Sequence, residues 1–210
     1  MKIFRKDFED KKYIMEYKKI ILKSCHQEEY PDLEIICRVL QKEEIGEYLR
    51  NIPEEKKFIG TKIAPVAARR GVVGEKVDTV LKTVIDGREY ILSEESGVVK
   101  ERDGLVDIVV TNVSSTSNEE YIVKAAKFAK TYNADGSGYY IPARDPRILT
   151  EVPENLIIMT AWGSEAICLQ GSYIVTYSEE ECDYNTLERG AKESTYEVTP
   201  INGQSKVLRK

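Results

Sequence analysis

The sequence predicts an α+β fold, in which an N-terminal helical segment precedes two β-rich repeats, each a small curled, barrel-like sheet closed by a short helix. Three observations support this prediction. Residues 5–24 contain no Gly or Pro, β-branched residues become common after Phe58, and short motifs of the first β-rich stretch recur in the second. The predicted parts are a helical segment over 1–57, a first repeat over 58–135, a second repeat over 136–199 and a polar tail over 200–210.

Apolar residues of the N-terminal segment recur at spacings of three and four, which is typical of one face of a helix. They are Phe4, Phe8, Tyr13, Tyr17, Ile20 and Ile21. Pro31 is predicted to open a second helix that runs to Ile52. Asp32 and Glu34 lie in its first turn, where negative charge suits the helix dipole.

After Phe58, short β-branched runs bounded by turn residues predict strands in both repeats. The first repeat is expected to contain strands over 62–68, 79–85, 89–92, 107–112 and 121–123, then a helix over 124–132. The second is expected to contain strands over 139–143, 147–152, 156–160, 165–169, 173–177 and 196–198, with a short helix over 185–192. Asp86-Gly87 is a type I′ hairpin signal, because both positions of that turn need a positive φ.

Several motifs occur once in each β-rich stretch in the same order, and the later ones keep nearly constant spacing, which predicts an internal duplication. The matched pairs are Ala68-Arg69 with Ala143-Arg144, Ile108–Thr111 with Tyr173–Thr176, Tyr121 with Tyr184, and Thr131-Tyr132 with Thr195-Tyr196. The alternative is chance similarity between two β-rich stretches. A unit of this size buries only a marginal core by itself, so the two would need to pair.

The ending Gly-x-Tyr-Ile-Val-Thr, followed later by Thr-Tyr-Glu, resembles the small PGDYG-type domain of bacterial and phage proteins. Phe128 and Tyr132 fit the Phe-x-x-x-Tyr helix of that family. Neither repeat carries the literal string, since Leu105-Val106 intrudes in one and Ser172 replaces Asp in the other. The resemblance covers about residues 58–198. It implies the fold and a phage- or bacteria-encoded accessory or inhibitor role, and it implies no reaction.

The composition limits the choice of partners. Of 210 residues, 41% are apolar and 32% charged, which is enough to bury a core. The net charge of −5 argues against nucleic acid and anionic membranes as partners. No run approaches the roughly 20 apolar residues of a membrane helix, and the charged N-terminus lacks the apolar run of a signal peptide. We therefore expect a cytoplasmic protein whose scattered cysteines, Cys25, Cys37, Cys168 and Cys182, are free thiols.

No phosphate-loop, dinucleotide-binding or nucleophile-elbow motif occurs in the chain, and no cofactor is predicted. His26 is the single histidine. It follows Cys25, and neighbouring residues on a helix point about 100° apart, so neither a Cys–His catalytic pair nor a metal site is expected. The turn Asp135-Gly136-Ser137-Gly138 offers a weak candidate for a phosphate cradle.

Arginines that precede a glutamate by six or seven residues are the main candidates for ligand binding. Arg69 and Glu75 form one such pair, and Arg144 and Glu151 form the other. An arginine fork can hold a phosphate or carboxylate at two points; alternatively, each pair pins a loop within its own repeat. The remaining candidates are Arg70, Arg147 and Trp162, where Trp162 either stacks on a ligand or covers the core.

These observations favour a non-enzymatic binding protein that holds a protein or an anionic small ligand in a groove between the two repeats. One alternative is a hydrolase or transferase acting on a nucleotide-like phosphorylated substrate, with Glu75 or Glu151 as the base. That enzyme would need an acid of raised pKa beside the arginines. Another alternative is an RNA-binding module that uses the arginines with Trp162, Tyr139 and Tyr140. The sequence predicts no particular oligomeric state.

Overall fold

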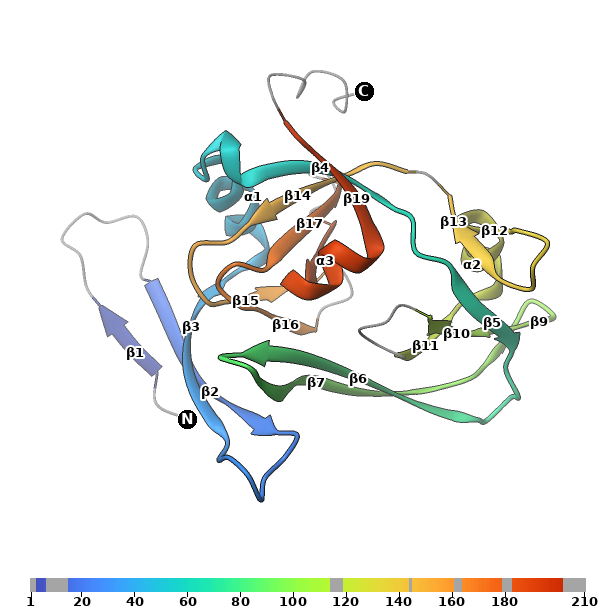
Figure 1. Cartoon of the computed structure of the whole chain (residues 1–210), viewed down its shortest axis with the longest axis horizontal. Helices are drawn as coiled ribbons and strands as arrows, with labels where there is room; N and C mark the ends of the chain where they lie inside the picture. Colours follow the sequence, from blue (N-terminus) through green and yellow to red (C-terminus); the bar gives the residue numbers. More distant parts are fainter. Residues whose placement is uncertain are drawn as a thin grey trace. The chain divides into compact units, whose positions relative to one another are not determined.

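The computed structural model describes residues 3–6, 15–113, 119–143, 145–160, 164–178 and 183–201. The chain is mostly β, with 56% of residues in strands and 15% in helices (Figure 1). The prediction of an α+β fold with an N-terminal helical segment is therefore wrong.

The region predicted as helix consists largely of paired strands. Strands β1 (Ile3–Lys6), β2 (Met15–Ser24) and β3 (Leu33–Leu40) form antiparallel pairs, with β2 between the other two. Along β2, Leu22 and Ser24 are buried whereas Ile21 is exposed, so burial follows the period of two of a strand. Neighbouring isoleucines satisfy a helical stripe and a strand equally well, and cross-strand pairing decided between them. Residues 7–14 lie outside the described parts.

Only the end of the second predicted helix is helical. Helix α1 (Lys42–Arg50) buries Ile45 and Leu49, and a capping box between Gln41 and Glu44 starts it. A 3₁₀ turn, Glu54–Lys56, follows.

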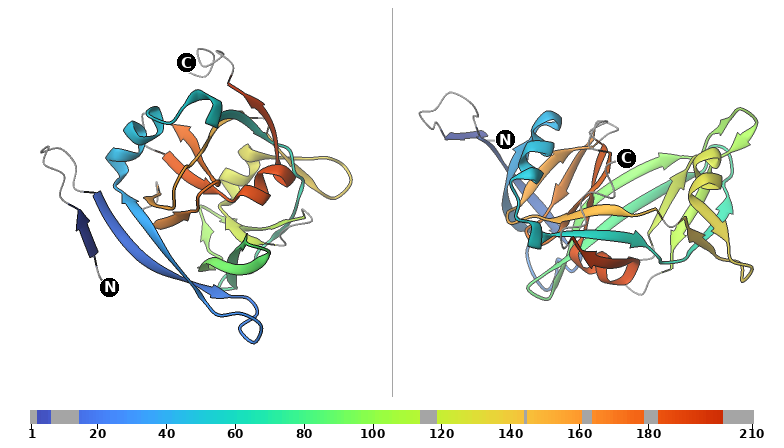
Figure 2. Two further views of the ribbon diagram at one scale, coloured as in Figure 1. Left: turned by 60° about the vertical axis from the view of Figure 1, so that its left-hand side comes forward. Right: turned by 90° about the horizontal axis from the view of Figure 1, so that it is seen from above.

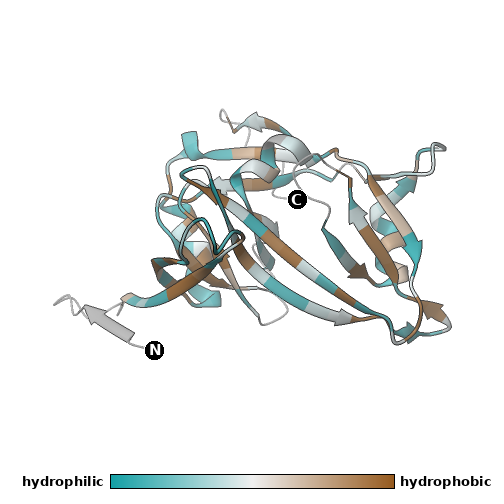
Figure 3. Ribbon diagram, turned by 60° about the horizontal axis from the view of Figure 1, so that its bottom comes forward, coloured by the Kyte–Doolittle hydropathy of each residue, from teal (hydrophilic) through white to brown (hydrophobic). Residues whose placement is uncertain are grey.

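The strand predictions after Phe58 agree better with the structure. The strands are β4 (Lys57–Lys62), β5 (Val66–Arg70), β6 (Lys76–Ile85), β7 (Arg88–Val98), β8 (Glu101–Arg102), β9 (Leu105–Val106), β10 (Ile108–Asn112), β11 (Glu120–Val123), β12 (Tyr132–Ala134), β13 (Tyr140–Pro142), β14 (Arg147–Glu151), β15 (Leu156–Met159), β16 (Glu165–Cys168), β17 (Tyr173–Ser178), β18 (Asp183–Leu187) and β19 (Tyr196–Pro200). Two further helices are α2 (Ala125–Thr131) and α3 (Arg189–Thr195). The predicted turn joins β6 to β7, with φ of 51° at Asp86 and 75° at Gly87. Apolar and polar bands alternate along the long strands in Figure 3.

Two compact units make up the chain, and neither is continuous in sequence. Unit 1 contains residues within 1–60, 147–189 and 198–210, and unit 2 those within 61–146 and 190–197. The predicted boundaries near 57, 135 and 199 stay a prediction.

Unit 1 contains two sheets. In one, β15 pairs antiparallel with β16 and parallel with β3. Strand β3 pairs on its other edge with β2, and β2 pairs with β1. The other has the order β18-β17-β14-β4-β19. Helix α1 contributes Ile45 and Leu49 to a buried core that also holds Leu156, Ile174 and Tyr184. Figure 2 shows the long β2–β3 hairpin in blue.

Unit 2 contains a five-stranded sheet with the order β11-β10-β5-β13-β12 and the long β6–β7 hairpin. Val66, Val110 and Phe128 form one buried cluster in this unit. The ring of Phe128 stacks on that of Tyr132, with centroids 4.9 Å apart.

The two five-stranded sheets have corresponding strand orders. In each, an antiparallel hairpin (β10–β11 or β17–β18) pairs with the strand β5 or β14, and the strand after a seven-residue helix (β12 or β19) forms the far edge. The fourth strand of each sheet is not the sequence neighbour of the central strand. In the sheet of β5 the fourth strand is β13, although β13 directly precedes β14 in the sequence. In the sheet of β14 the fourth strand is β4, although β4 directly precedes β5.

None of the described helices is long and apolar enough to cross a membrane. Among the described cysteines, Cys25, Cys37 and Cys168 are free thiols, and Cys182 lies outside the described residues.

Candidate functional site

The first predicted arginine–glutamate pair forms in unit 2. Arg69, at the end of β5, donates two hydrogen bonds to Glu75, at 3.0 and 2.5 Å. The amide of Val72 also donates to Glu75, at 3.0 Å. The Arg69 guanidinium, followed by this amide, lowers the pKa of Glu75 from 4.5 to about 2. The pair thus holds the loop between β5 and β6, which is the structural role weighed against ligand binding.

The other predicted site residues have different surroundings. Glu151 accepts a hydrogen bond from Lys56 at 2.8 Å, and the guanidinium of Arg147 lies 4.8 Å from the centre of the Tyr177 ring. Arg70 is exposed at the end of β5. Arg144 and Trp162 lie outside the described residues, so the second pair and the predicted stacking residue stay predictions.

In the glycine turn after β12, the carboxylate of Asp135 already accepts the hydrogen bonds that a bound phosphate would need. Asp135 accepts hydrogen bonds from the amide of Ser137 at 2.8 Å and from its hydroxyl at 2.7 Å. These bonds, the hydroxyl's first, lower the pKa of Asp135. A phosphate would have to compete with this negative charge, so the turn is a poor cradle for an anion.

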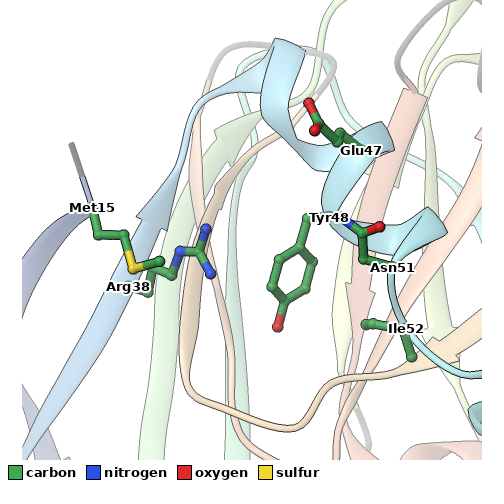
Figure 4. A pocket seen from close by; sticks show the side chains of 6 residues that line it. All are labelled: Met15, Arg38, Glu47, Tyr48, Asn51 and Ile52. Carbon is green, nitrogen blue, oxygen red and sulfur yellow. The ribbon is translucent and has the colours of Figure 1, made fainter. Parts of the chain in front are cut away.

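A pocket that the sequence did not predict lies in unit 1, beside α1. It has a volume of about 300 Å³ and is lined by Met15 of β2, Arg38 of β3 and Glu47, Tyr48, Asn51 and Ile52 of α1 and the turn after it. In Figure 4, Met15 and Arg38 lie on one side and the residues of α1 on the other, with the Tyr48 ring between them. The pocket therefore combines a guanidinium, a carboxylate and an amide with one aromatic ring and the apolar side chains of Met15 and Ile52.

Arg38 and Tyr48 of this pocket form a connected group with Glu154, which lies beside it. The hydroxyl of Tyr48 donates to Glu154 at 3.2 Å, and Nη1 of Arg38 donates to the same carboxylate oxygen at 3.4 Å. The guanidinium carbon lies 5.3 Å from the centre of the Tyr48 ring, within cation–π range. Burial, and then the Glu154 charge, raise the pKa of Tyr48.

The backbone of β3 fixes the position of Arg38. Its amide donates to the carbonyl of Asn155 at 2.9 Å, which ties β3 to the loop that carries Glu154. Its side chain is only 20% exposed, compared with 37% for Glu154. The cation is thus the more deeply placed partner and the carboxylate the more accessible one.

An exposed surface of mixed character continues from the pocket along the β2–β3 hairpin, where Ile36 and Ile21 lie beside the exposed ion pair of Lys19 and Glu34. Tyr17 pairs with Arg38, Lys19 with Ile36, and Ile21 with Glu34. Because cross-strand partners share a face and side chains alternate, Ile36 and Ile21 lie on the face that carries Arg38. Both isoleucines are 61% exposed. We call this set (Met15, Ile21, Ile36, Arg38 and Tyr48) the hairpin face.

Sequence reasoning missed the pocket because Met15 and Arg38 lie in a region assigned to the wrong secondary structure, and because Glu154, which contacts Arg38, is 116 residues further along the chain. Apolar residues in succession at 20–21 and 35–36 were a signal, since adjacent residues of a strand face opposite sides and one of each pair must point outward.

A scan against protein-family models, a search of curated proteins and a search of solved structures each found no match to this chain.

Proposed function

We propose that this chain is a non-enzymatic protein-binding module and that the hairpin face is its recognition surface. The observation that carries the proposal is the pocket around Arg38 and Tyr48 beside two isoleucines that are each 61% exposed. Arg, Tyr and Met are enriched at protein interfaces, and binding hot spots combine such an anchor with surrounding contacts that exclude water.

The size of the pocket supports a side-chain anchor rather than a substrate or cofactor. Its volume of about 300 Å³ is at the lower end of the range for small-molecule sites, which is roughly 300–1,000 Å³. A pocket of this size accommodates one side chain of a partner, while the flanking strands supply the rest of the contact area.

The enzyme alternative receives less support from the charged groups. It needs an acid of raised pKa beside the predicted arginines, whereas Glu75 has its pKa lowered by Arg69. The same ion pair neutralises Arg69, and the net charge is −5, which weighs against an RNA-binding role. The accessory or inhibitor role implied by the PGDYG-type resemblance is compatible with a protein partner and stays a prediction.

We also propose that the two five-stranded sheets are copies of one duplicated unit that have exchanged a strand. Their corresponding orders support this, with β4 and β13 each completing the sheet of the other copy. So do the two seven-residue helices, which each end in a threonine followed by a tyrosine. Exchange of β4 and β13 explains why each five-stranded sheet contains one strand from outside the contiguous sequence of its own repeat.

Affinity capture with the full chain and two surface variants tests the binding role. The double variant Ile21→Ser/Ile36→Ser alters the hairpin face, and Val84→Ser is the matched control because Val84 of β6 is equally exposed, at 61%. We expect the wild type and the Val84 variant to retain the same partner, and the double variant to lose it. Capture that the double variant leaves unchanged would overturn the proposal.

A further inference from the structure

Glu154 is a loosely held partner of Arg38. The 3.4 Å distance between them exceeds the 2.7–2.9 Å that is typical of charge-assisted hydrogen bonds. Glu154 contacts Arg38 through one oxygen, and that oxygen also accepts the Tyr48 hydroxyl. This single, long contact makes poor use of a guanidinium that can hold a carboxylate by two parallel bonds.

Arg38 retains unused capacity for hydrogen bonding. A guanidinium has five N–H donors, and within the described part of the chain only Glu154 accepts from this one. The Tyr48 ring covers one face of the Arg38 guanidinium, and Met15 lines the same pocket. These contacts hold the plane of the guanidinium in one orientation. A second carboxylate could pair with that edge without a large rearrangement of Arg38.

The charge around the pocket favours a singly charged ligand. Arg38 supplies one positive charge, whereas Glu47 brings a carboxylate to the pocket lining and Glu154 contacts Arg38 from beside it. A phosphate dianion would meet both of them, but a carboxylate adds one negative charge and can displace Glu154. Met15 and Ile52 offer apolar contact to the methylene groups of an acidic side chain.

We infer that this pocket binds an acidic side chain of the partner protein, and that Glu154 occupies Arg38 until that side chain displaces it. This inference rests on the proposed binding function and adds the chemistry of the anchor residue. Glu154 then has two roles: it keeps the guanidinium oriented in the free protein, and it lowers the affinity for acidic ligands by competing with them.

The probe for this inference is a blocked glutamate, N-acetyl-glutamate amide, titrated into the full chain, with N-acetyl-glutamine amide as the uncharged match. The signal is the ¹H–¹⁵N resonance of the Arg38 Nε–H group. We expect the glutamate probe to shift this resonance with a Kd in the millimolar range, as suits one side chain, and the glutamine probe to leave it in place. Arg38→Lys removes this reporter, so its binding is read from the backbone amide resonance of Tyr48 in both proteins; we expect the shift of that resonance to be lost because the variant lacks the planar fork.

Removal of the competing carboxylate gives the sharper test. Glu154→Gln should tighten binding of the glutamate probe by about fivefold or less, the fold-change that corresponds to a partly exposed ion pair. Glu43→Gln removes the same charge from exposed Glu43 of α1, outside the pocket, and should leave binding unchanged. Equal gains in the two variants would overturn the role of Glu154.

Two further outcomes decide the ligand class and separate this inference from the proposed function. Inorganic phosphate that shifts the Arg38 resonance more strongly than the glutamate probe would overturn the assignment to a carboxylate. If neither probe binds while partner capture still depends on Ile21 and Ile36, the anchor inference fails and the proposed function stands. If the glutamate probe binds and the Ile21→Ser/Ile36→Ser variant captures the partner as well as the wild type does, the proposed function fails instead.

Discussion

Thr131 and Thr195 end two seven-residue helices with the same hydrogen bond, in which each hydroxyl donates to a carbonyl four residues earlier, that of Lys127 or Ala191. Their own carbonyls also have matching partners. That of Thr131 accepts from Ala143, which follows β13, and that of Thr195 accepts from Ile63, which follows β4. The two helix ends therefore contact matching positions after β13 and β4, the two strands that the sheets are proposed to have exchanged.

Strand exchange predicts where the effect of a local substitution is felt. Ile59→Gly in β4 should accelerate amide hydrogen exchange in β14, because Ile59 pairs with Ile148, and should leave β5 protected. Ile141→Gly in β13 should accelerate exchange in β12 and β5 and leave β14 protected. Hydrogen–deuterium exchange read by mass spectrometry measures both. Loss of protection in β5 after the β4 substitution would contradict the exchanged arrangement.

The Arg69–Glu75 pair predicts an acid titration well below the ordinary range. A depressed carboxyl pKa adds stability above the unfolded value near 4.5, and this stability is lost as pH falls toward about 2. The carboxyl resonance of Glu75 in ¹³C NMR should therefore titrate near pH 2. Arg69→Ala should move it toward 4.5, short of the full value because Val72 still donates. Arg70→Ala is the control, and an equal shift there would point to general charge rather than the specific pair.

The buried cysteines predict unequal thiol reactivity. Burial raises the pKa of Cys37 to about 11 and raises that of Cys168 further, whereas Cys25 is half-exposed in the connection between β2 and β3. At pH 8, about one Cys37 thiol in a thousand is ionised. Iodoacetamide labelling followed by peptide mass spectrometry should find Cys25 modified and Cys37 and Cys168 protected until the protein unfolds. Labelling of Cys168 at the rate of Cys25 would contradict the described core.

Asp107 predicts a stability effect in unit 2. It is 2% exposed, accepts the amide of Lys100 at 3.0 Å and pairs with Arg102 at 2.5 Å. Asp107→Ala leaves that amide without its acceptor, so the free energy of unfolding should fall by about 2 kcal/mol. Glu101→Ala, at an exposed position of the same hairpin, should change it by less than about 0.5 kcal/mol. Urea unfolding measures both, and equal effects would contradict the role of Asp107.

The sequence predicted correctly those features that depend only on residues close together in the chain. Asp86-Gly87 forms the expected turn because its φ requirements are carried by those two residues, and Glu75 lies close enough to Arg69 for their spacing to indicate the pair. The region around Ile20 and Ile21 could not be assigned in this way. Its Lys and Glu residues favour a helix, and its strand partner, β3, is recognisable only once the chain has folded back.

The hairpin face was beyond prediction for a related reason. Arg38 and Tyr48 meet because α1 folds over the end of β3, and Glu154 arrives from a loop after β14. No spacing in the sequence relates residues so far apart. Without that geometry, Arg38 is one of many charged residues in a polar segment.

Site-specific photocrosslinking tests the recognition surface most directly. A benzoylphenylalanine placed at position 36 or, as the equally exposed reference, at position 84 samples two surfaces of the same protein. The binding account predicts one crosslinked partner from position 36, none from position 84, and loss of the first crosslink when Arg38→Ala is added. Crosslinks of equal yield at both positions, or a position-36 crosslink that survives the loss of Arg38, would contradict it.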